Sequence, residues 1–367
     1  MKLALVVPGF SSSERDWCIP ALLDYVRVLA QDAEVHVFTL RWPERGGCYR
    51  VYGATVHAMD GRRHLGARVA GLWARAVRAI AAEHRRGPFD VVHAFWLDEA
   101  GWVAALAGAR LRRPVVLSVA GGELVGKRDI GYGLGLLPGR RVLARWLMGL
   151  AALVTGGSDY LLRLIRQQMP PGRHARIRRA PLGVDLDRFG LADPATVTSI
   201  ALNVGALYPV KDQALLLRTA ARVPGLTVRI AGDGPLLGAP QAQAAELGLQ
   251  ERVAFLGAVE HGALPSVYAE ASVFVQTSRH EAQGMALLEA AVCGVPAIGT
   301  PVGVLPEIGT AASTEAELAG ALEALLHDPA RRLRLGREAR ERAAEGFGLA
   351  RAKRTFCELY AEVAGQG

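Results

Sequence analysis

Two glutamates, Glu281 and Glu289, stand eight positions apart in a chain of 367 residues. On a single α-helix, eight residues make a little over two turns, so the two carboxylates would share one face. The pair Gln283 and Gly284 between them has turn character, however. The sequence therefore predicts Glu281 in a loop and Glu289 inside the helix that follows.

The start of that helix is suited to binding an anion. The backbone N–H groups of Gly284, Met285 and Ala286 would lie in the first turn, where intrahelical partners are missing and the helix dipole favours negative charge. With Glu281 before it and Glu289 two turns into it, the segment can hold hydroxyls on both sides of a diphosphate, which is the shape of a nucleotide-sugar. The alternative is an exposed glutamate and a coincidental spacing.

The order of elements around the glutamates carries a family resemblance. An apolar strand over 271–276 precedes Ser278 and the glutamates, and a second apolar segment over 297–300 follows a Gly-Val-Pro turn. In this order the chain resembles the retaining glycosyltransferases of family 4, which have the GT-B fold and a Glu-x7-Glu signature. The resemblance covers essentially the whole chain and is strongest over 183–307.

The resemblance implies separate roles for the two glutamates. Glu289 would accept hydrogen bonds from the ribose hydroxyls of the donor, whereas Glu281 would meet the hydroxyls of the donor sugar and act in catalysis. Backbone N–H groups would complete this surface, from Gln283, Gly284 and Met285.

A lysine follows the first predicted strand of the second half of the chain. In the family this segment begins with Gly-Arg-Leu and ends on a lysine, and the arginine and the lysine clamp the diphosphate. Here Gly205 and Lys211 match the pattern, but Ala206 stands in the place of the arginine. Because only four of the 43 basic residues are lysines, Lys211 suggests that a compact ammonium is needed for catalysis. The alternative is that Lys211 is one of four scattered lysines.

Two further segments resemble the donor side of the family. Gly232 and Gly234 form a glycine turn after a predicted strand, and relatives place this turn at the sugar-nucleotide site. Phe255 and Leu256 lie in a strand whose backbone meets the base in relatives. An ordinary turn and an ordinary core strand explain these residues equally well.

The first half of the chain departs from the family pattern. Ser11 and Ser12 occupy the loop where relatives often have paired glycines, and Ala120 stands where many relatives have a histidine beside the donor sugar. In the front-face retaining mechanism the leaving phosphate itself takes the acceptor proton, so the missing histidine does not abolish the chemistry. The next residues offer open backbone and a polar contact on the acceptor or donor-sugar side, namely Gly121, Gly122 and Glu123.

His93 ends another predicted strand and has two interpretations. It could face the acceptor or the donor sugar from the carboxyl end of its strand, or it could be a hydrogen-bonded histidine of the core. The core interpretation is favoured.

Alternating strands and helices predict an α/β chain with two parallel sheets, each covered on both faces. With the resemblance, this indicates the GT-B fold, two Rossmann-like domains facing a central cleft. We expect an acceptor-binding domain over 1–188, a nucleotide-sugar-binding domain over 189–345, and a terminal helix over 346–367 that crosses back to the first domain. The predicted strands lie at 3–7, 34–39, 91–94, 114–119, 153–155, 177–180, 200–204, 227–231, 253–256, 273–276 and 297–298.

No cofactor and no metal are expected. The Asp-x-Asp pair at 185–187 falls in the segment where relatives have Gly-Val-Asp between the domains, and the four cysteines are scattered without metal-ligand spacing. The donor would be a nucleoside-diphosphate sugar, with either UDP or GDP as its nucleotide, and the acceptor a glycan, a lipid-linked molecule or a small molecule.

Positive charge is concentrated in the first half of the chain. Residues 1–188 hold 28 Lys and Arg against 16 Asp and Glu, with basic, amphipathic segments over 62–86 and 140–145. These segments, with Trp73, Trp146, Leu147 and Met148, indicate peripheral contact with an anionic membrane. The alternative is a general preference for arginine. No nucleic-acid motif accompanies the charge.

The place of action is expected to be the cytoplasm, with peripheral contact at the inner face of the membrane. No apolar run reaches the roughly 18 residues that a spanning helix needs. The opening residues are expected to form a strand rather than a signal peptide.

Two functions stay open. The first is a retaining hexosyltransferase that uses a nucleoside-diphosphate sugar. The second is a sugar-nucleotide-binding protein of the same fold without turnover, prompted by Ala206 and Ala120. The first is favoured because Lys211, Glu281 and Glu289 are all present. A sugar-nucleotide epimerase fits less well, since the Glu-x7-Glu context belongs to transferases.

Overall fold

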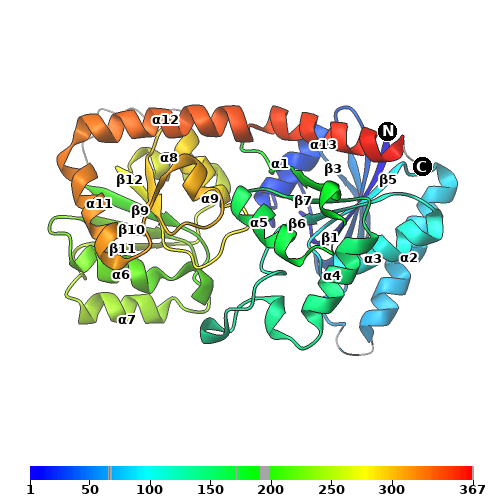
Figure 1. Cartoon of the computed structure of the whole chain (residues 1–367), viewed down its shortest axis with the longest axis horizontal. Coiled ribbons are helices and arrows are strands. Elements are labelled where there is room, and N and C mark those ends of the chain that lie inside the picture. The colour runs from blue at the N-terminus through cyan, green and yellow to red at the C-terminus, as the bar shows by residue number, and fades with distance from the viewer. Residues whose placement is uncertain (65, 67, 171, 191–198, 366–367) are drawn as a thin grey trace. The chain divides into compact units, whose positions relative to one another are not determined.

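The computed structural model describes residues 1–64, 66, 68–170, 172–190 and 199–365. The chain forms two compact units (Figure 1). Unit 1 contains Met1–Lys127, Gly133–Gly183 and the residues from Leu349 onward, and unit 2 contains Arg128–Tyr132 and Val184–Gly348. Parts of the predicted domain over 189–345 and of the predicted terminal segment over 346–367 lie outside the described residues.

Unit 1 is built on an eight-stranded sheet of order β3-β4-β2-β1-β5-β6-β7-β8. Its neighbouring strands are parallel except for the antiparallel pair β3 and β4. The central strands are buried on both faces, which explains their continuous apolar runs. The strands are β1 (Lys2–Gly9), β2 (Glu34–Trp42), β3 (Gly46–Val51), β4 (Ala54–Met59), β5 (Val91–Phe95), β6 (Val115–Val119), β7 (Leu153–Gly156) and β8 (Ile177–Arg179).

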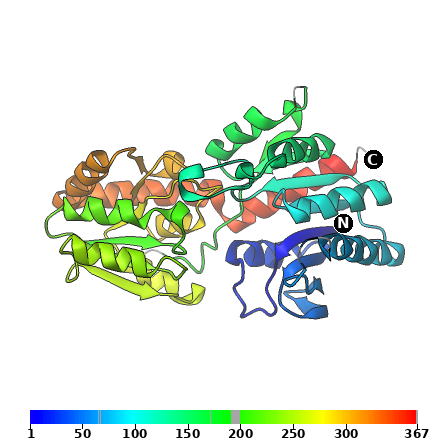
Figure 2. The same cartoon turned by 90° about the horizontal axis from the view of Figure 1, so that it is seen from below.

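Helices cover both faces of this sheet (Figures 1 and 2). The consecutive helices α2, α3 and α4 contact one another in that order, and α13 packs against α1. The helices of unit 1 are α1 (Pro20–Leu29), α2 (Arg68–Arg86), α3 (Glu99–Leu111), α4 (Arg140–Leu150), α5 (Asp159–Gln168) and α13 (Leu349–Ala364).

Unit 2 is built on a six-stranded parallel sheet of order β11-β10-β9-β12-β13-β14. Its strands are β9 (Ile200–Val204), β10 (Thr227–Ala231), β11 (Val253–Gly257), β12 (Val273–Gln276), β13 (Ala297–Gly299) and β14 (Thr310–Ala311). Its helices are α6 (Gln213–Ala221), α7 (Gly238–Glu246), α8 (Leu264–Ala269), α9 (Met285–Val292), α10 (Leu305–Ile308), α11 (Glu315–His327) and α12 (Pro329–Phe347).

Apart from the short segment Arg128–Tyr132, which belongs to unit 2, the chain passes between the units after Gly183 and again after Gly348, where the predicted bounds were 188 and 345. The passage is fixed by close packing on each side. A Cβ on Gly183 would lie 2.6 Å from the Cα of Leu349, and the Val184 N–H donates to the Phe347 carbonyl over 2.7 Å. The first boundary between the units therefore lies a few residues before the predicted position 188, and the second lies a few residues after the predicted position 345.

The predicted strands are all present, but the hairpin of β3 and β4 and the two-residue strand β14 were not predicted. Tyr52 and Gly53 connect β3 and β4, both with positive φ, at 46° and 83°. A Tyr-Gly pair is a weaker turn signal than Asn-Gly, and the flanking residues do not alternate cleanly between apolar and polar.

Candidate donor site in unit 2

Three loops at the carboxyl ends of β9, β10 and β11 are joined by backbone hydrogen bonds. The Gly205 N–H donates to Ala231, and the Gly232 N–H donates to Gly257 over 2.7 Å. A Cβ on Gly232 would lie 2.1 Å from the Gly205 carbonyl oxygen, and one on Gly234 would lie 2.7 Å from the Leu207 carbonyl oxygen. The two predicted turn glycines therefore serve the close approach of neighbouring loops.

The backbone at Lys211 is fixed by hydrogen bonds to two successive carbonyls, its own and that of Val210. It ends a short 3-10 turn, η4 (Pro209–Lys211), and its carbonyl accepts a hydrogen bond of 3.0 Å from the Thr277 hydroxyl. The Arg279 N–H donates to the neighbouring Val210 carbonyl over 2.7 Å. The turn after β9 is thus fixed to the loop after β12, which carries Glu281.

Lys211 and Glu281 are brought into direct contact, although 70 positions separate them. The Lys211 Nζ lies 2.5 Å from the Glu281 Oε1, and the Ser278 hydroxyl donates to the same oxygen over 2.6 Å. Gly205 lies alongside, because a Cβ there would be 3.5 Å from the Lys211 Cε. One partly buried cluster therefore contains both residues that we expect to be catalytic.

The loop before α9 has the predicted shape. Glu281 lies in the loop, Glu289 lies in the helix, and Gly284 is the N-cap with φ of 100°. The Gln283 carbonyl accepts from Val304, and the Gln283 amide contacts the Met285 sulfur. The first turn of α9, at Gly284 and Met285, thus follows directly on the loop that carries Glu281.

The backbone of Gly303 packs closely against the loop that carries Glu281 and Gln283. A Cβ there would lie 2.4 Å from the Gln283 carbonyl oxygen and 2.8 Å from the Glu281 Cβ, and its φ is +62°. Only glycine fits this position without displacing Glu281.

Glu289 is buried and is already hydrogen-bonded within unit 2. Its residue is 6% exposed, its Oε1 lies 3.1 Å from the His261 Nε2, and its Oε2 accepts from the Tyr268 hydroxyl over 2.8 Å. Burial, with the Glu289 charge beside it, raises the pKa of Tyr268 well above its ordinary value. A carboxylate has further lone pairs, so Glu289 can still accept from a ribose, but its first partners belong to the protein.

Phe255 and Leu256 lie on β11, an edge strand of unit 2. Phe255 is half-buried and packs against the core, whereas Leu256 is exposed. The core-strand interpretation therefore accounts for Phe255, and the role of the backbone in binding a base stays a prediction.

Glu123 does not project from its loop toward a ligand, which corrects the expectation for this residue. It is buried, and its carboxylate accepts hydrogen bonds from the backbone N–H groups of Leu97, Ala120 and Gly121, at 3.2, 3.2 and 2.7 Å. Desolvation raises the pKa of this carboxyl above its ordinary value. Of the two glycines whose backbone was expected to be open to a ligand, Gly121 donates its N–H to Glu123 and Gly122 accepts at its carbonyl from the Leu134 N–H. The N–H of Ala120 likewise helps to close the loop.

His93 belongs to the core, which confirms the favoured interpretation; the alternative, in which it faces the acceptor or the donor sugar, is wrong. It is fully buried, with its Nδ1 2.6 Å from the Tyr360 hydroxyl and its Nε2 2.8 Å from the Ser118 hydroxyl. Burial lowers the pKa of His93 to about 3. Through Tyr360, which also bonds Tyr25 over 2.6 Å, this histidine ties α13 to the sheet and to α1.

The serine loop after β1 is only partly exposed. Ser11 is buried and its carbonyl accepts from the Tyr49 hydroxyl, while the Ser12 N–H donates to Asp16 over 2.7 Å. The Ser11 hydroxyl has no hydrogen-bond partner among the described residues. Contact of either serine with an acceptor stays a prediction.

Outside the donor site, three potential metal ligands meet in unit 1. His36, His57 and Glu83 each place one ligand atom within 4.8 Å of the others. The two imidazoles are already bonded to each other over 3.0 Å, and the Lys2 ammonium lies 3.3 Å from Glu83. The Glu83 carboxylate is thus paired with an ammonium, and the two imidazoles are paired with each other.

The sequence reading assigned no site role to four residues that organise the donor site: Ser278, His261, Tyr268 and Gly303. Ser278 was detectable from its position three residues before Glu281. The other three reach the glutamates through tertiary packing, for which the sequence holds no local signal.

The comparisons with known proteins agree with the two-unit architecture. Residues 22–188 match the family described as Glycosyltransferase Family 4, and residues 194–342 match Glycosyl transferases group 1. The chain is 32% identical over 247 residues to D-inositol 3-phosphate glycosyltransferase from Mycobacterium sp. (strain JLS), an alignment that covers 61% of this chain and 54% of that protein. The chain thus spans about half the length of the curated relatives it matches.

Solved structures show the same fold. Sucrose-phosphate synthase from Thermosynechococcus elongatus superposes with a TM-score of 0.82 at 21% identity, over 100% of both chains. Anabaena HepE in complex with UDP and glucose superposes with a TM-score of 0.79 at 20% identity, over 99% of this chain and 100% of that chain. With both halves matched in sequence and the whole chain matched in fold, this protein belongs to the family 4, group 1 glycosyltransferases and has the GT-B fold.

Proposed function

We propose that this protein is a retaining glycosyltransferase that moves a hexose-type sugar from a nucleoside-diphosphate sugar to a glycan, a lipid-linked acceptor or a small molecule. The observation that carries the proposal is the cluster of Lys211, Glu281 and Ser278 directly before the first turn of α9. A relative of the same fold has been solved with UDP and glucose, which supports a nucleotide-sugar as the donor.

The residues divide the chemistry among them. The Lys211 ammonium and the first-turn N–H groups of α9 would stabilise the negative charge that develops on the departing diphosphate. Glu281 would hold hydroxyls of the donor sugar, and Glu289 would hold the ribose. Because Lys211 and Glu281 form an ion pair, a diphosphate would share or displace the carboxylate as the ammonium's partner.

In the proposed reaction, the bond between the anomeric carbon and the diphosphate oxygen breaks. A bond from the acceptor oxygen forms on the same face of the sugar, and the acceptor proton passes to the leaving phosphate. No side chain needs to act as nucleophile or base. The step is therefore compatible with Ala120 and with a His93 that is held in the core.

The second candidate is a protein that binds a sugar-nucleotide without turnover. The observation that favours it is Ala206, an exposed alanine in place of the clamping arginine of the family. It would share the donor affinity but not the turnover of the first candidate.

A thermal-shift screen of UDP, GDP and their sugars tests whether the protein binds a donor. A ligand that binds only the folded state raises the apparent Tm as its concentration rises above Kd. We expect a shift with one nucleotide series and its loss in Lys211→Ala. Absence of a shift with every nucleotide, for a protein with a cooperative unfolding transition, would contradict both candidates.

A further inference from the structure

Helix α4 turns a row of large apolar side chains toward solvent. Its buried side contains Ala144, Leu147 and Met148. Its opposite side carries three apolar residues, each four positions after the one before. Val142 is 69% exposed, Trp146 53% and Leu150 52%. Leu147 and Met148, which the sequence reading expected at a membrane, therefore face the core, and other residues of the same helix form the exposed face.

A row of stacked tryptophans extends this face across neighbouring helices. Trp146 of α4 stacks on Trp102 of α3 with ring centroids 5.2 Å apart, and Trp102 stacks on Trp73 of α2 at 6.3 Å. Tryptophan is enriched at membrane–water interfaces because its ring is apolar and its N–H is polar.

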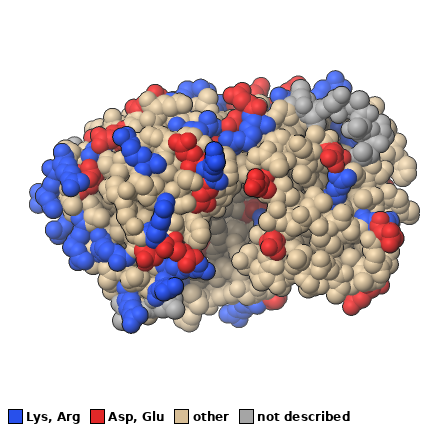
Figure 3. Space-filling view, turned by 180° about the vertical axis from the view of Figure 1, so that it is seen from behind, with Lys and Arg blue, Asp and Glu red and all other residues tan. Residues whose placement is uncertain are grey.

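The charges on α4 are all positive. Arg140, Arg141 and Arg145 are exposed, and the helix contains no acidic residue. By contrast, the basic segment over 62–86 is partly neutralised, because Arg62 pairs with Glu44 and Arg86 with Glu83. Figure 3 views unit 1 from behind, on a face other than that of α4, where basic side chains also gather. The apolar face of α4 is thus flanked by exposed arginines, of which Arg141 and Arg145 form no ion pair with the part of the chain that the structure describes.

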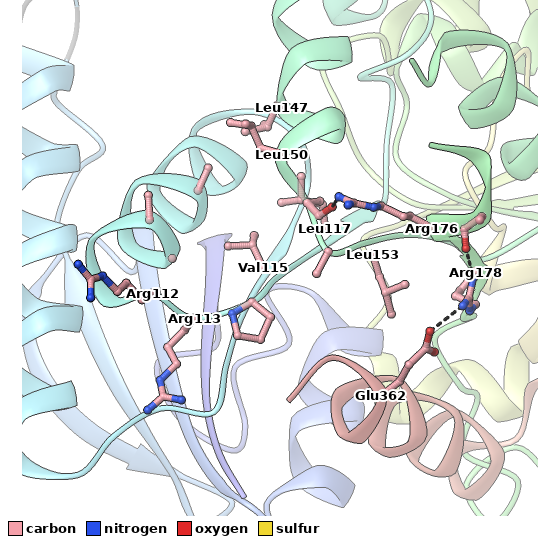
Figure 4. A pocket seen from close by; sticks show the side chains of 17 residues that line it. Arg112, Arg113, Val115, Leu117, Leu147, Leu150, Leu153, Arg176, Arg178 and Glu362 are labelled. Carbon is pink, nitrogen blue, oxygen red and sulfur yellow. Dashed lines mark hydrogen bonds and ion pairs between the residues drawn. The ribbon is translucent and has the colours of Figure 1, made fainter. Parts of the chain in front are cut away.

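A cavity of about 590 Å³ opens beside α4, within unit 1 (Figure 4). Leu147 and Leu150 line it on the α4 side, and its basic residues are Arg112, Arg113, Arg176 and Arg178. Arg178 is paired with Glu362 over 2.6 Å, whereas the buried Nε of Arg113 has no hydrogen-bond partner among the described residues. Arginine around an apolar wall suits a phosphate that is attached to a hydrocarbon chain.

We propose that the exposed face of α4 and the adjoining arginine-lined cavity form a docking surface for a bilayer of anionic phospholipids. The apolar side chains Val142, Leu143, Trp146 and Leu150 enter the interface, Arg141 and Arg145 lie at the headgroups, and the cavity receives a phosphate headgroup.

A second copy of this chain is a poorer occupant of the same surface. A two-fold dimer would place the patch against itself, so that Arg140, Arg141 and Arg145 would face the same three arginines of the other copy. An anionic surface, by contrast, is attracted to all three.

Sedimentation with vesicles tests the surface. We expect negligible binding to pure phosphatidylcholine and strong binding when 30 mol% is replaced by phosphatidylglycerol, with a several-fold loss but not abolition as salt rises. Arg141→Gln/Arg145→Gln should reduce binding at low salt, and Val142→Ser/Trp146→Ser/Leu150→Ser should remove the part that resists salt. Matched controls in unit 2, Arg331→Gln/Arg337→Gln and Leu247→Ser/Leu333→Ser, should bind as the wild type does.

A separate experiment tests the cavity. Arg112→Gln/Arg113→Gln should weaken binding to the anionic vesicles more than the arginine control does, and soluble glycerol 3-phosphate should protect the wild type against thermal unfolding less than the vesicles do. Equal protection by the soluble phosphate would assign the cavity to a free phosphate compound instead.

Three results would overturn the proposal: no association with anionic vesicles at low salt, equal binding by the α4 variants and their controls, or a dimer in lipid-free sedimentation velocity that the α4 variants abolish. Circular dichroism and Tm establish that each variant is folded. Nucleotide binding by the α4 variants should be unchanged, so the outcome here is separate from that of the proposed function.

Discussion

Lys211 and Glu281 are each other's nearest charged partners in the donor site, at 2.5 Å. Such a pair in a partly buried site orients both side chains, and it lets a diphosphate compete for the ammonium at the moment of binding. The Lys211 side chain is 28% exposed and that of Glu281 is 14% exposed. The proposed stabilisation of the departing diphosphate therefore depends first on the positive charge of Lys211.

Replacing Lys211 with alanine should remove most turnover. Loss of one preorganised donor to a developing oxyanion typically costs on the order of 10²–10³ in kcat. Lys211→Arg should retain little activity, because the planar guanidinium is longer and differently shaped. Steady-state kinetics check this, with Lys353→Ala, the lysine that pairs with Asp32 over 2.5 Å, as a matched control. Near-normal rates in Lys211→Ala would place charge stabilisation elsewhere.

Glu289→Ala should weaken nucleotide-sugar binding and also lower stability. Hydrogen bonds to a charged acceptor contribute roughly 1.5–3 kcal/mol each, and the variant leaves His261 and Tyr268 without their partner. Tyr268→Phe separates the two effects, since it removes one internal bond but keeps the carboxylate. Calorimetry should show near-normal affinity in Tyr268→Phe and reduced affinity in Glu289→Ala. Unchanged affinity in folded Glu289→Ala would disprove the ribose assignment.

At the element scale, α13 is attached to the sheet of unit 1 by a buried polar network. His93 bonds Tyr360 and Ser118, and Ser118 bonds Thr155 over 2.6 Å. Every member is satisfied, which is what makes a buried polar network stabilising. The neutral form of His93 is therefore part of the fold, with consequences for its response to acid.

Stability should fall as pH decreases below about 6.5. The pKa of His93 is lowered from 6.5 to about 3 by burial, so between these values the unfolded chain binds a proton that the folded chain does not. Stability is then lost as pH falls, by up to about 1.4 kcal/mol per pH unit for one such group. His57, with its pKa lowered to about 4, first by burial and then by His36, acts in the same direction.

Urea denaturation between pH 7.5 and 5 measures this dependence. His93→Gln should flatten the slope, and His327→Gln, at an exposed histidine, should not. If His93→Gln does not fold, the NMR titration of the wild type decides the question. A His93 resonance that titrates near pH 6.5 would contradict a neutral core histidine.

Local patterns in the sequence were sufficient for eleven of the strands, though not for β3, β4 and β14, and for Glu281 in a loop and Glu289 in a helix. These depend on hydrophobic runs and turn residues within a few positions of one another. The environments of Glu289, Glu123 and His93 depend instead on partners 21 to 267 positions away, or on a loop folding back on itself. No periodicity reports such contacts, so carboxylates and an imidazole that looked available to a ligand proved to be bonded within the protein.

At the scale of the whole molecule, the two units carry different surfaces. Unit 2 contains the cluster around Lys211, whereas unit 1 contains the arginine-flanked face of α4. Within the described residues, no helix has both the length and the apolar character needed to cross a bilayer.

Activity should survive excess EDTA. In the proposed mechanism, Lys211 and the first turn of α9 take the place of a cation at the diphosphate. An assay with a nucleotide-sugar, before and after chelation and dialysis, checks this. Loss of activity that added Mn²⁺ or Mg²⁺ restores would show that the diphosphate needs a metal, and a fall in Tm without loss of initial rate would point instead to a structural ion.

The most direct test of the central claim is turnover of the nucleotide-sugar that gives the largest thermal shift, with the product examined by NMR. We expect release of the nucleoside diphosphate, a glycoside with the anomeric configuration of the donor, and loss of both in Lys211→Ala and Glu281→Ala. A product of inverted configuration, or transfer that is unaffected in those two variants, would contradict the central claim.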